Sequence, residues 1–407
     1  MKHVIIGAGA AGIIAARTIR ELKPNDEIVI ISKDEHIISR CLLHRYICGE
    51  RREDQLSFIE DGFFEDNRIE WIRGGNVNKL DASAKIVYYS GSSTTFDTLL
   101  IATGAKAFIP PVGTLRTAKN VFGLRDFGDA KAIAEIVETA NKIVVIGAGF
   151  VDLDAAYAFT RLKKDVHIID VAPHVLSANL DAQSAVAYQR RFEDAGCRFT
   201  FGYGVYDTVE SEPGKISQVI LENGQALDCD FVVVSTGVYP ARELLDGSGV
   251  VIDKLAMVNE YMETNIKGIY AAGDVAGLSG IWPNARRQGE VAARNMCGFE
   301  TVYEDSFALK NTVNFYDLAT LTVGVLAPED GDIVITRTET DLYQRLILRG
   351  GCVVGAILQG DISNAGFWQY LIKKQIPVDK IDKPIWKISF ADFCGVSETG
   401  DYYWQHA

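Results

Sequence analysis

The sequence predicts an α/β protein that carries one strand–turn–helix unit twice and ends in a smaller α+β region. A short apolar run that stops in a glycine-rich turn precedes a helical pattern at residues 3–22, and the same order returns at residues 142–161. From about residue 303 the pattern changes to successive short strands separated by turns, followed by one helix.

Each element of the first cycle follows from its own pattern. Apolar runs without polar alternation indicate buried strands, and apolar residues at helical spacing indicate helices. The elements expected here are a strand at His3–Ile6, a helix at Ala10–Leu22, a strand at Glu27–Ile31, a helix at Arg40–Gly49, and a hairpin with arms at residues 76–90 and 95–101.

The second cycle repeats this order, and the run Ser235-Thr236-Gly237 near its end echoes Ala102-Thr103-Gly104 in the first. The elements expected are a strand at Ile143–Ile146, a turn at Gly147–Gly149, a helix at Val151–Arg161, strands at Val166–Asp170, Phe231–Val234 and Gly268–Asp274, and a final helix at Ala365–Lys374.

Composition excludes several classes of protein. The 407 residues carry 41 Lys and Arg against 54 Asp and Glu, a net charge of −13, so a nucleic-acid partner is not expected. The seven cysteines show no CxxC spacing, which speaks against a disulfide framework or a metal site and favours a reducing, cytoplasmic location. No run approaches the ~18 apolar residues of a membrane span.

The first glycine set, Gly7, Gly9 and Gly12, lies between a predicted strand and a predicted helix. In this context the first glycine permits a tight turn, the second lets a pyrophosphate approach the backbone, and the third lets helix and strand pack closely. An acidic residue that holds a ribose hydroxyl is expected about 20 residues later. Ser32 occupies that place, and either its hydroxyl or a carboxylate two or three residues later fills the role.

The second set reads Gly147, Gly149 and then Asp152 where a third small residue is expected. Asp170, at the end of the next strand, is placed to bind a ribose 2′-hydroxyl and would repel a 2′-phosphate, which favours NAD over NADP. Two interpretations of Asp152 remain. Either the site binds NAD despite this side chain, or the fold has kept its shape and lost the ligand.

Together these motifs resemble the FAD/NAD(P)H oxidoreductases of the pyridine nucleotide–disulfide reductase superfamily. The region after residue 303 is similar to the C-terminal domain of NADH:rubredoxin reductases and of the flavin part of nitrite reductases. The resemblance implies an FAD domain at 1–112 and 240–302, an NAD domain at 113–239 and a C-terminal interface domain at 303–407.

The resemblance and the glycine spacing together give two sets of candidate binding residues and no metal site. The FAD set is Gly7, Gly9, Ala10, Ala11, Gly12, Ser32, Lys33, Arg40, Cys41, Thr103, Gly104, Gly273, Asp274, Asn284 and Gln288. The NAD set is Gly147, Gly149, Phe150, Val151, Asp152, Asp170 and Gly237.

Two residues are candidates for a direct part in the chemistry. Cys41 matches the position of the single redox cysteine in one branch of the superfamily, and a helix start beside Arg40 could lower its pKa. The competing interpretation is a small residue packed beside the flavin. Asp154 falls where many relatives have a glutamate near the flavin–nicotinamide contact, or is simply a first-turn acid. His44 is expected to be an exposed polar side chain.

The function expected is an FAD-dependent NADH oxidoreductase that exchanges electrons with a small redox protein, of the rubredoxin or ferredoxin type, or with a partner subunit. One alternative is a Cys41-dependent reductase of CoA disulfide, persulfide or peroxide. Another is an FAD-carrying or structural subunit of a larger redox complex with a degenerate NAD site. A homo-oligomer or a hetero-complex is compatible with each.

Overall fold

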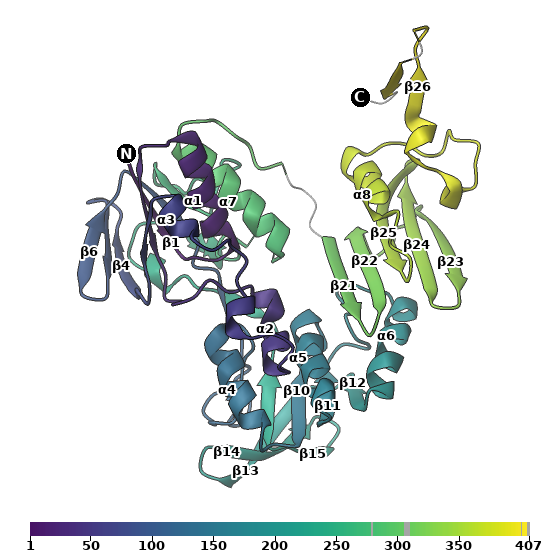
Figure 1. Cartoon of the computed structure of the whole chain (residues 1–407). Helices are drawn as coiled ribbons and strands as arrows, with labels where there is room; N and C mark the ends of the chain where they lie inside the picture. Colours follow the sequence, from purple (N-terminus) through teal and green to yellow (C-terminus); the bar gives the residue numbers. More distant parts are fainter. Residues whose placement is uncertain (278–279, 305–309, 400, 405–407) are drawn as a thin grey trace. The chain divides into compact units, whose positions relative to one another are not determined.

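The computed structural model describes residues 1–277, 280–304, 310–399 and 401–404. It divides the chain into two compact units (Figure 1). Unit 1 comprises Met1–Val171 and Gly196–Asp305, and unit 2 comprises Ala172–Ala195 and Ser306–Ala407. Both units are therefore built from segments that are not contiguous in sequence.

The first sheet of unit 1 is fully parallel, with the strand order β20-β7-β1-β2-β3. Its strands are β1 (Lys2–Ile6), β2 (Glu27–Ile31), β3 (Ile69–Ile72), β7 (Thr98–Ile101) and β20 (Ile269–Ala271). Helix α1 (Ala10–Leu22) packs against α7 (Trp282–Met296), and the contact is close because a Cβ on Gly289 would lie 2.2 Å from the Ala11 carbonyl oxygen. The chain beyond β20 thus completes the N-terminal fold.

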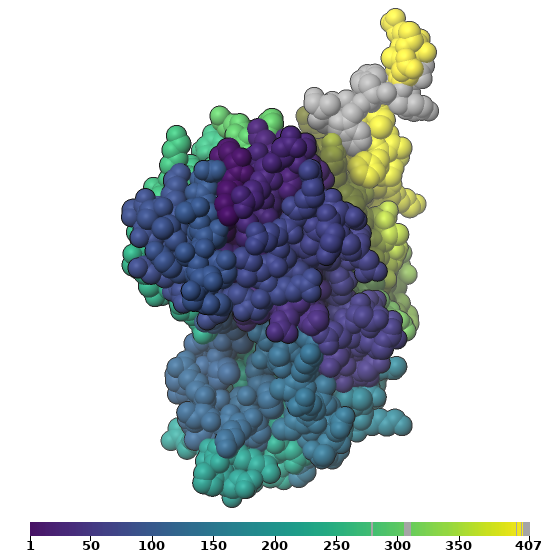
Figure 2. Space-filling model, turned by 60° about the vertical axis from the view of Figure 1, so that its left-hand side comes forward, coloured from purple at the N-terminus to yellow at the C-terminus, as the bar shows by residue number. Residues whose placement is uncertain are grey.

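The second sheet of unit 1 repeats this arrangement with the order β12-β11-β10-β16-β9. Its strands are β9 (Val121–Phe122), β10 (Lys142–Ile146), β11 (Asp165–Asp170), β12 (Cys197–Phe201) and β16 (Phe231–Val234), with helices α4 (Phe127–Val137) and α5 (Phe150–Arg161). An antiparallel sheet of β13 (Val205–Glu212), β14 (Lys215–Leu221) and β15 (Ala226–Asp228) lies at the end of unit 1 opposite to the N-terminus (Figures 1 and 2).

The hairpin expected between residues 76–90 and 95–101 is wrong. Strands β4 (Val77–Asp81), β5 (Ile86–Tyr89) and β6 (Ser92–Thr95) form a separate antiparallel sheet, whereas β7 pairs in parallel with β1. All four residues of β7 are buried, as is typical of a central strand covered on both faces.

Short elements connect the larger ones. The helix expected at Arg40–Gly49 is shorter: a single 3₁₀ turn at Arg40–Leu42 precedes α2 (Leu43–Ile47), which packs against α4 and α5. The remaining short elements described in unit 1 are α3 (Phe63–Asp66), β8 (Ala105–Ala107), β17 (Val238–Pro240), β18 (Ile252–Asp253), β19 (Leu255–Ala256) and the 3₁₀ turns Glu53–Gln55 and Glu243–Leu245.

Unit 2 is an α+β fold around an antiparallel sheet with the order β21-β22-β25-β24-β23. Its elements are α6 (Ala182–Asp194), β21 (Lys310–Phe315), β22 (Leu318–Gly324), β23 (Ile333–Glu339), β24 (Leu342–Arg349), β25 (Cys352–Gln359), α8 (Ala365–Lys374), β26 (Cys394–Val396) and β27 (Tyr402–Trp404). Helix α6 belongs here because its buried Tyr188 and Phe192 contact the ring of Phe315. The predicted fold class, two Rossmann-like units and an α+β region, is confirmed.

Within the described part of the chain, no helix combines the length and the apolar character that a membrane crossing requires.

Candidate functional site

The first glycine-rich loop joins β1 to α1 and has the geometry of a phosphate cradle. Gly7 adopts φ +109°, and a Cβ there would lie 2.2 Å from the Ala102 carbonyl oxygen. A Cβ on Gly12 would lie 1.9 Å from the Gly7 carbonyl oxygen, so only glycine allows α1 to approach β1 this closely. A Cβ on Gly9 would meet nothing within 4 Å, so the backbone there is open to an incoming group.

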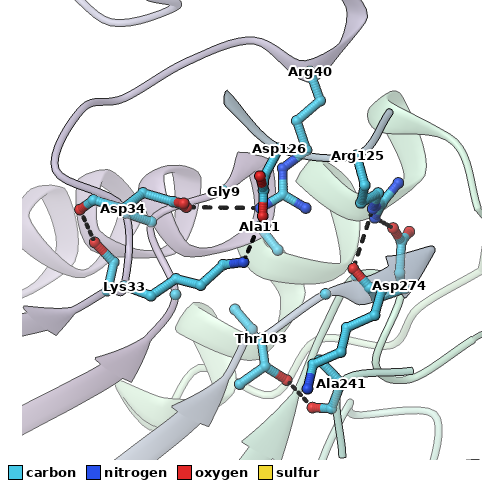
Figure 3. Close-up of a pocket in the computed structure, with 18 of the residues that line it drawn as sticks. Gly9, Ala11, Lys33, Asp34, Arg40, Thr103, Arg125, Asp126, Ala241 and Asp274 are labelled. Atoms are coloured by element: carbon cyan, nitrogen blue, oxygen red, sulfur yellow. Dashed lines mark hydrogen bonds and ion pairs between the residues drawn. The ribbon is translucent and has the colours of Figure 1, made fainter. Parts of the chain in front are cut away.

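A cavity of ≈710 Å³ opens at this loop (Figure 3). A volume of this size suits a large ligand. Among the residues that line it are most of the predicted FAD residues, namely Gly7, Gly9, Ala10, Ala11, Ser32, Lys33, Arg40, Cys41, Thr103, Gly104, Gly273 and Asp274. The carboxyl ends of β1, β2, β7 and β20 therefore meet at one site, as expected for a ligand-binding edge of a parallel sheet.

Four cationic side chains line the cavity, each beside a carboxylate, and three of these pairs are labelled in Figure 3. In the fourth, Lys106 Nζ donates to Glu243 Oε1 at 2.7 Å. Lys33 Nζ donates to Asp126 Oδ2 at 2.8 Å, and Arg40 Nη2 lies 3.7 Å from Asp34 Oδ2. Arg125 pairs with Asp274. Burial lowers the pKa of Arg40, and the positive charge of Arg125 lowers it further. Guanidinium groups held this close are typical of a site for an anionic ligand.

The hydrogen bonds of Ser32 favour Asp34 over Ser32 as the residue placed to bind a ribose. The Ser32 hydroxyl donates to the Asp34 carbonyl oxygen at 2.9 Å and accepts from Trp71 Nε1 at 3.0 Å. With its proton and one lone pair used in this way, Ser32 keeps one lone pair to accept from a ribose hydroxyl, whereas a carboxylate offers several. Asp34 lines the cavity and carries the carboxylate expected at this strand end.

Three predicted FAD residues lie behind the lining and support it. Gly12 provides the close approach of α1 described above. Gln288, which is fully buried on α7, accepts a hydrogen bond from the Gly273 amide at 2.7 Å through Oε1. Asn284 is buried one turn earlier on the same helix. Gln288 thus fixes the loop that presents Asp274 to the cavity.

The second glycine-rich loop, between β10 and α5, has nearly the same backbone as the first. The residue before the helix has φ −81° and ψ −169° at Gly9, and φ −82° and ψ −171° at Gly149. Asp170 Oδ2 accepts from the Ala148 amide at 2.7 Å, so this strand-end carboxylate lies against the loop. Asp152 Oδ2 accepts from the Gly149 amide at 2.9 Å and is buried.

The other predicted NAD residues surround this loop. Phe150 and Val151 form the first turn of α5, and the side chain of Val151 is exposed. Gly237 follows β16 with φ +121°, and a Cβ there would meet nothing within 4 Å. The loop thus keeps the backbone of a dinucleotide site, but Asp152 is an added side chain whose Oδ2 would lie 3.3 Å from a Cβ on Gly149, a position that is open at Gly9 in the first loop.

Of the two interpretations of Cys41, the surroundings do not support the thiol with a lowered pKa. Cys41 lies in the 3₁₀ turn before α2, and a helix of five residues supplies little dipole. Burial raises the pKa of the thiol, and the neighbouring Asp154 raises it further, against smaller lowering effects from Ser39 and Arg125. Cys41 does line the cavity and is exposed to it, but as a thiol at neutral pH.

His44 is buried, contrary to the expectation of an exposed side chain. Its Nδ1 lies 3.3 Å from Asp154 Oδ1, and its ring meets the Tyr157 ring edge-on, so α2 contacts α5 here. Burial lowers the pKa of His44 to about 4 and raises that of Asp154 to about 8. The two groups therefore hold one proton between them over that range, and the pair is neutral.

Arg125 is the cavity residue that sequence reasoning missed. It precedes the helix cap Asp126 and donates through Nε to the Ala105 carbonyl oxygen at 3.1 Å, in addition to its pair with Asp274. A single arginine before a helix belongs to no recognisable spacing. Only the fold brings it to a strand end about 150 residues away in sequence.

The comparison with protein families decides the assignment. Residues 1–289 match the pyridine nucleotide-disulphide oxidoreductase family, and residues 310–376 match the rubredoxin NAD⁺ reductase C-terminal domain. The chain belongs to the pyridine nucleotide-disulphide oxidoreductase family. It is accordingly an oxidoreductase with FAD as cofactor and NADH as co-substrate. The glycine cradle, the open position at Gly9 and the cationic lining fit FAD.

Relatives with several different activities are similar to this chain in sequence. An NADH oxidase of Methanocaldococcus jannaschii is 33% identical, over 74% of this chain and 71% of its own length. The epsilon subunit of an NADH-dependent phenylglyoxylate dehydrogenase of Aromatoleum evansii is 27% identical, over 92% of both chains. The nitrite reductase [NAD(P)H] of Bacillus subtilis is 27% identical over 93% of this chain, which spans only 48% of that protein.

Solved structures share the fold across nearly the whole chain. A ferredoxin reductase of Rhodopseudomonas palustris superposes with a TM-score of 0.85 at 23% identity, covering 93% of this chain and 95% of the other. An NAD-dependent persulfide reductase of A. fulgidus superposes with a TM-score of 0.84 at 27% identity, covering 94% and 79%. The predicted family and architecture are confirmed.

Proposed function

We propose that the chain is an NADH-dependent flavoprotein that exchanges electrons with a small redox protein of the rubredoxin or ferredoxin type, or with a partner subunit. The observation that carries this proposal is the pair of dinucleotide loops with matching backbone in unit 1, one of which opens on the cavity. When bound, FAD supplies the ability to take up a hydride and release electrons singly.

Different residues of unit 1 are placed to bind different parts of FAD and NADH. Gly9, at the start of α1, presents its backbone amide to a pyrophosphate, with Lys33 and Arg40 as nearby positive charges. The Gly7 amide instead donates to the Ile31 carbonyl oxygen at 2.8 Å and holds the turn. Asp34 is placed for the ribose of the adenosine part and Asp274 for the ribityl chain, the latter held by Arg125. In the second loop Asp170 is placed for a ribose of NADH. We propose domains at 1–112 with 240–302, 113–239 and 303–407.

The C-terminal domain match and the relatives support a protein as the electron acceptor. Residues 310–376 match a domain described from rubredoxin reductases. The epsilon subunit of the phenylglyoxylate dehydrogenase, which is similar over 92% of both chains, is one subunit of an NADH-dependent enzyme. These findings favour a protein acceptor over a small disulfide, and they support a partner subunit as well as a free redox protein.

A thiol reductase is the second candidate, because Cys41 is exposed to the cavity and a persulfide reductase shares the fold. Its raised pKa speaks against a thiolate that stores electrons at neutral pH. We therefore expect Cys41→Ser to retain both flavin reduction by NADH and turnover with a protein acceptor. Loss of turnover with flavin reduction intact would support the thiol reductase instead.

The test of the main proposal is anaerobic mixing of the purified FAD-loaded protein with NADH. Loss of flavin absorbance, followed by its return on addition of oxidised rubredoxin or ferredoxin, is the expected result. A flavin that dithionite reduces and NADH does not would contradict the NADH site and point to a carrier subunit. Reduction by NADH that no redox protein reverses would contradict the acceptor alone.

A further inference from the structure

The second dinucleotide loop contains a buried acid at the point where a pyrophosphate is expected. Asp152 is 2% exposed, and both of its carboxyl oxygens would lie 2.6 Å from a Cβ on Gly147. The carboxyl group thus lies beneath the second loop, at the position where Gly12 packs against the Gly7 carbonyl oxygen in the first loop. This contact and its φ of +119° both require glycine at residue 147.

The two oxygens of this carboxyl group have different surroundings. Oδ2 accepts a hydrogen bond from the Gly149 amide at 2.9 Å, whereas Oδ1 is fully buried and has no hydrogen-bond partner within the described residues. An ionised carboxylate would place a negative charge on this buried oxygen, which is unfavourable even with the Ser235 hydroxyl nearby to favour the charged form. A proton on Oδ1 removes that cost, so the geometry itself favours the neutral acid.

The charges around Asp152 also favour the neutral form of this acid. Asp170, at the end of β11, faces it across the loop, while His44 and Arg45 of α2 lie against Asp154 further along α5. Burial raises the pKa of Asp152 well above its usual range, and Asp170 raises it further. The Gly149 amide, the amide of Asp152 itself and the Ser235 hydroxyl lower it and offset only part of this. A second negative charge beside Asp170 and a pyrophosphate would add repulsion.

We propose that Asp152 enters the coenzyme site as the neutral acid, so that this loop binds NAD⁺ or NADH only together with the proton on Asp152. The inference rests on the proposed NADH site and gives that site a proton requirement. Asp152 then does not abolish coenzyme binding. It makes the binding proton-linked, and the affinity falls once this acid ionises.

Calorimetric titration of NAD⁺ into the oxidised, FAD-loaded protein between pH 6 and pH 10 tests the proposal without turnover. Linkage to one proton predicts that Kd rises by about tenfold per pH unit above a break, and that each NAD⁺ takes up close to one proton there. Titrations in two buffers of different ionisation enthalpy measure that uptake. In Asp152→Asn, which keeps the shape without the titrating group, both effects should vanish.

Two further variants complete the design. Asp194→Asn makes the same chemical change at an exposed position of α6 and should behave as wild type. Asp152→Gly restores the third glycine and serves if the Asn variant does not retain FAD. Affinity that is independent of pH in the wild type, or an alkaline loss that persists in both Asp152 variants, would overturn the proton linkage alone. No binding of NAD⁺ by any variant at any pH would overturn the coenzyme site with it.

Discussion

The third small position of the two loops shows what a single residue changes. Gly9 and Gly149 have the same backbone conformation although Gly12 follows one and Asp152 the other. The loop shape therefore depends on the first two glycines, and the third position decides what lies beneath the phosphate site. In one loop that is the Gly7 carbonyl oxygen, and in the other it is a carboxyl group.

Asp154 gives a prediction about stability and pH. Its pKa is raised in the folded protein to about 8, so its contribution is fully present below the unfolded pKa near 4 and is lost as the pH rises toward 8. Asp154→Asn removes this loss. We expect the urea midpoint of the variant to rise steadily relative to that of the wild type from pH 5 to pH 8. A difference that stays constant over this range would show that Asp154 ionises normally. Asp194→Asn is the control.

At the scale of elements, local sequence patterns are sufficient to predict the bounds of several helices and strands. The bounds of α1, β2, β16 and α8 are those expected from the sequence, because apolar spacing and flanking glycines are local signals. Burial of His44 could not be predicted, since it depends on α2 packing against α5. The local pattern of β7 likewise predicts a hairpin arm. Only its parallel pairing with β1, which is distant in sequence, shows that it is a central strand.

The β1–α1 unit predicts opposite outcomes for two neighbouring alanine substitutions. Gly12→Ala forces a methyl group to within 1.9 Å of the Gly7 carbonyl oxygen, so we expect a loss of about 3 kcal/mol in the free energy of unfolding. Gly9→Ala meets nothing within 4 Å and should fold normally. Its methyl group, however, occupies the approach to the cavity, so the purified protein should contain less FAD.

Denaturant titrations of both proteins and the ratio of flavin to protein absorbance distinguish these effects. Equal stability of both variants would contradict the close approach of α1. Full flavin content in Gly9→Ala would contradict the placement of a phosphate at this amide.

At the scale of the whole molecule, the most unexpected feature is the membership of α6. The sequence places it inside the second dinucleotide unit, between β11 and β12, yet it packs in unit 2. Tyr188 donates a hydrogen bond to the Leu318 carbonyl oxygen at 2.5 Å, about 130 residues away. No local pattern reveals such a partner, which is why the order of motifs predicted the fold class but not this arrangement.

Asp181 holds α6 in unit 2 and provides a test of that arrangement. It caps the helix through the Ser184 amide at 2.8 Å, and its Oδ2 accepts from Tyr343 at 2.6 Å and from Arg345 at 3.0 Å. Asp181→Ala leaves the half-buried Arg345 without this carboxylate, so we expect a loss of about 3 kcal/mol. Limited proteolysis should then cleave within residues 172–195 before other sites. Unchanged cleavage would show that α6 does not depend on this contact.

The membership of α6 also limits how this protein can be recombined with its relatives. An exchange at about residue 303 would transfer the sheet of unit 2 and leave behind the helix whose Tyr188 and Phe192 complete its core. Such a chimera would expose aromatic surface on the retained helix and leave a gap against the acquired sheet. A functional graft needs two inserts, residues 172–195 and 306–407, taken from the same parent. Acceptor specificity, if it resides in unit 2, is thus inherited through two separate stretches of the gene.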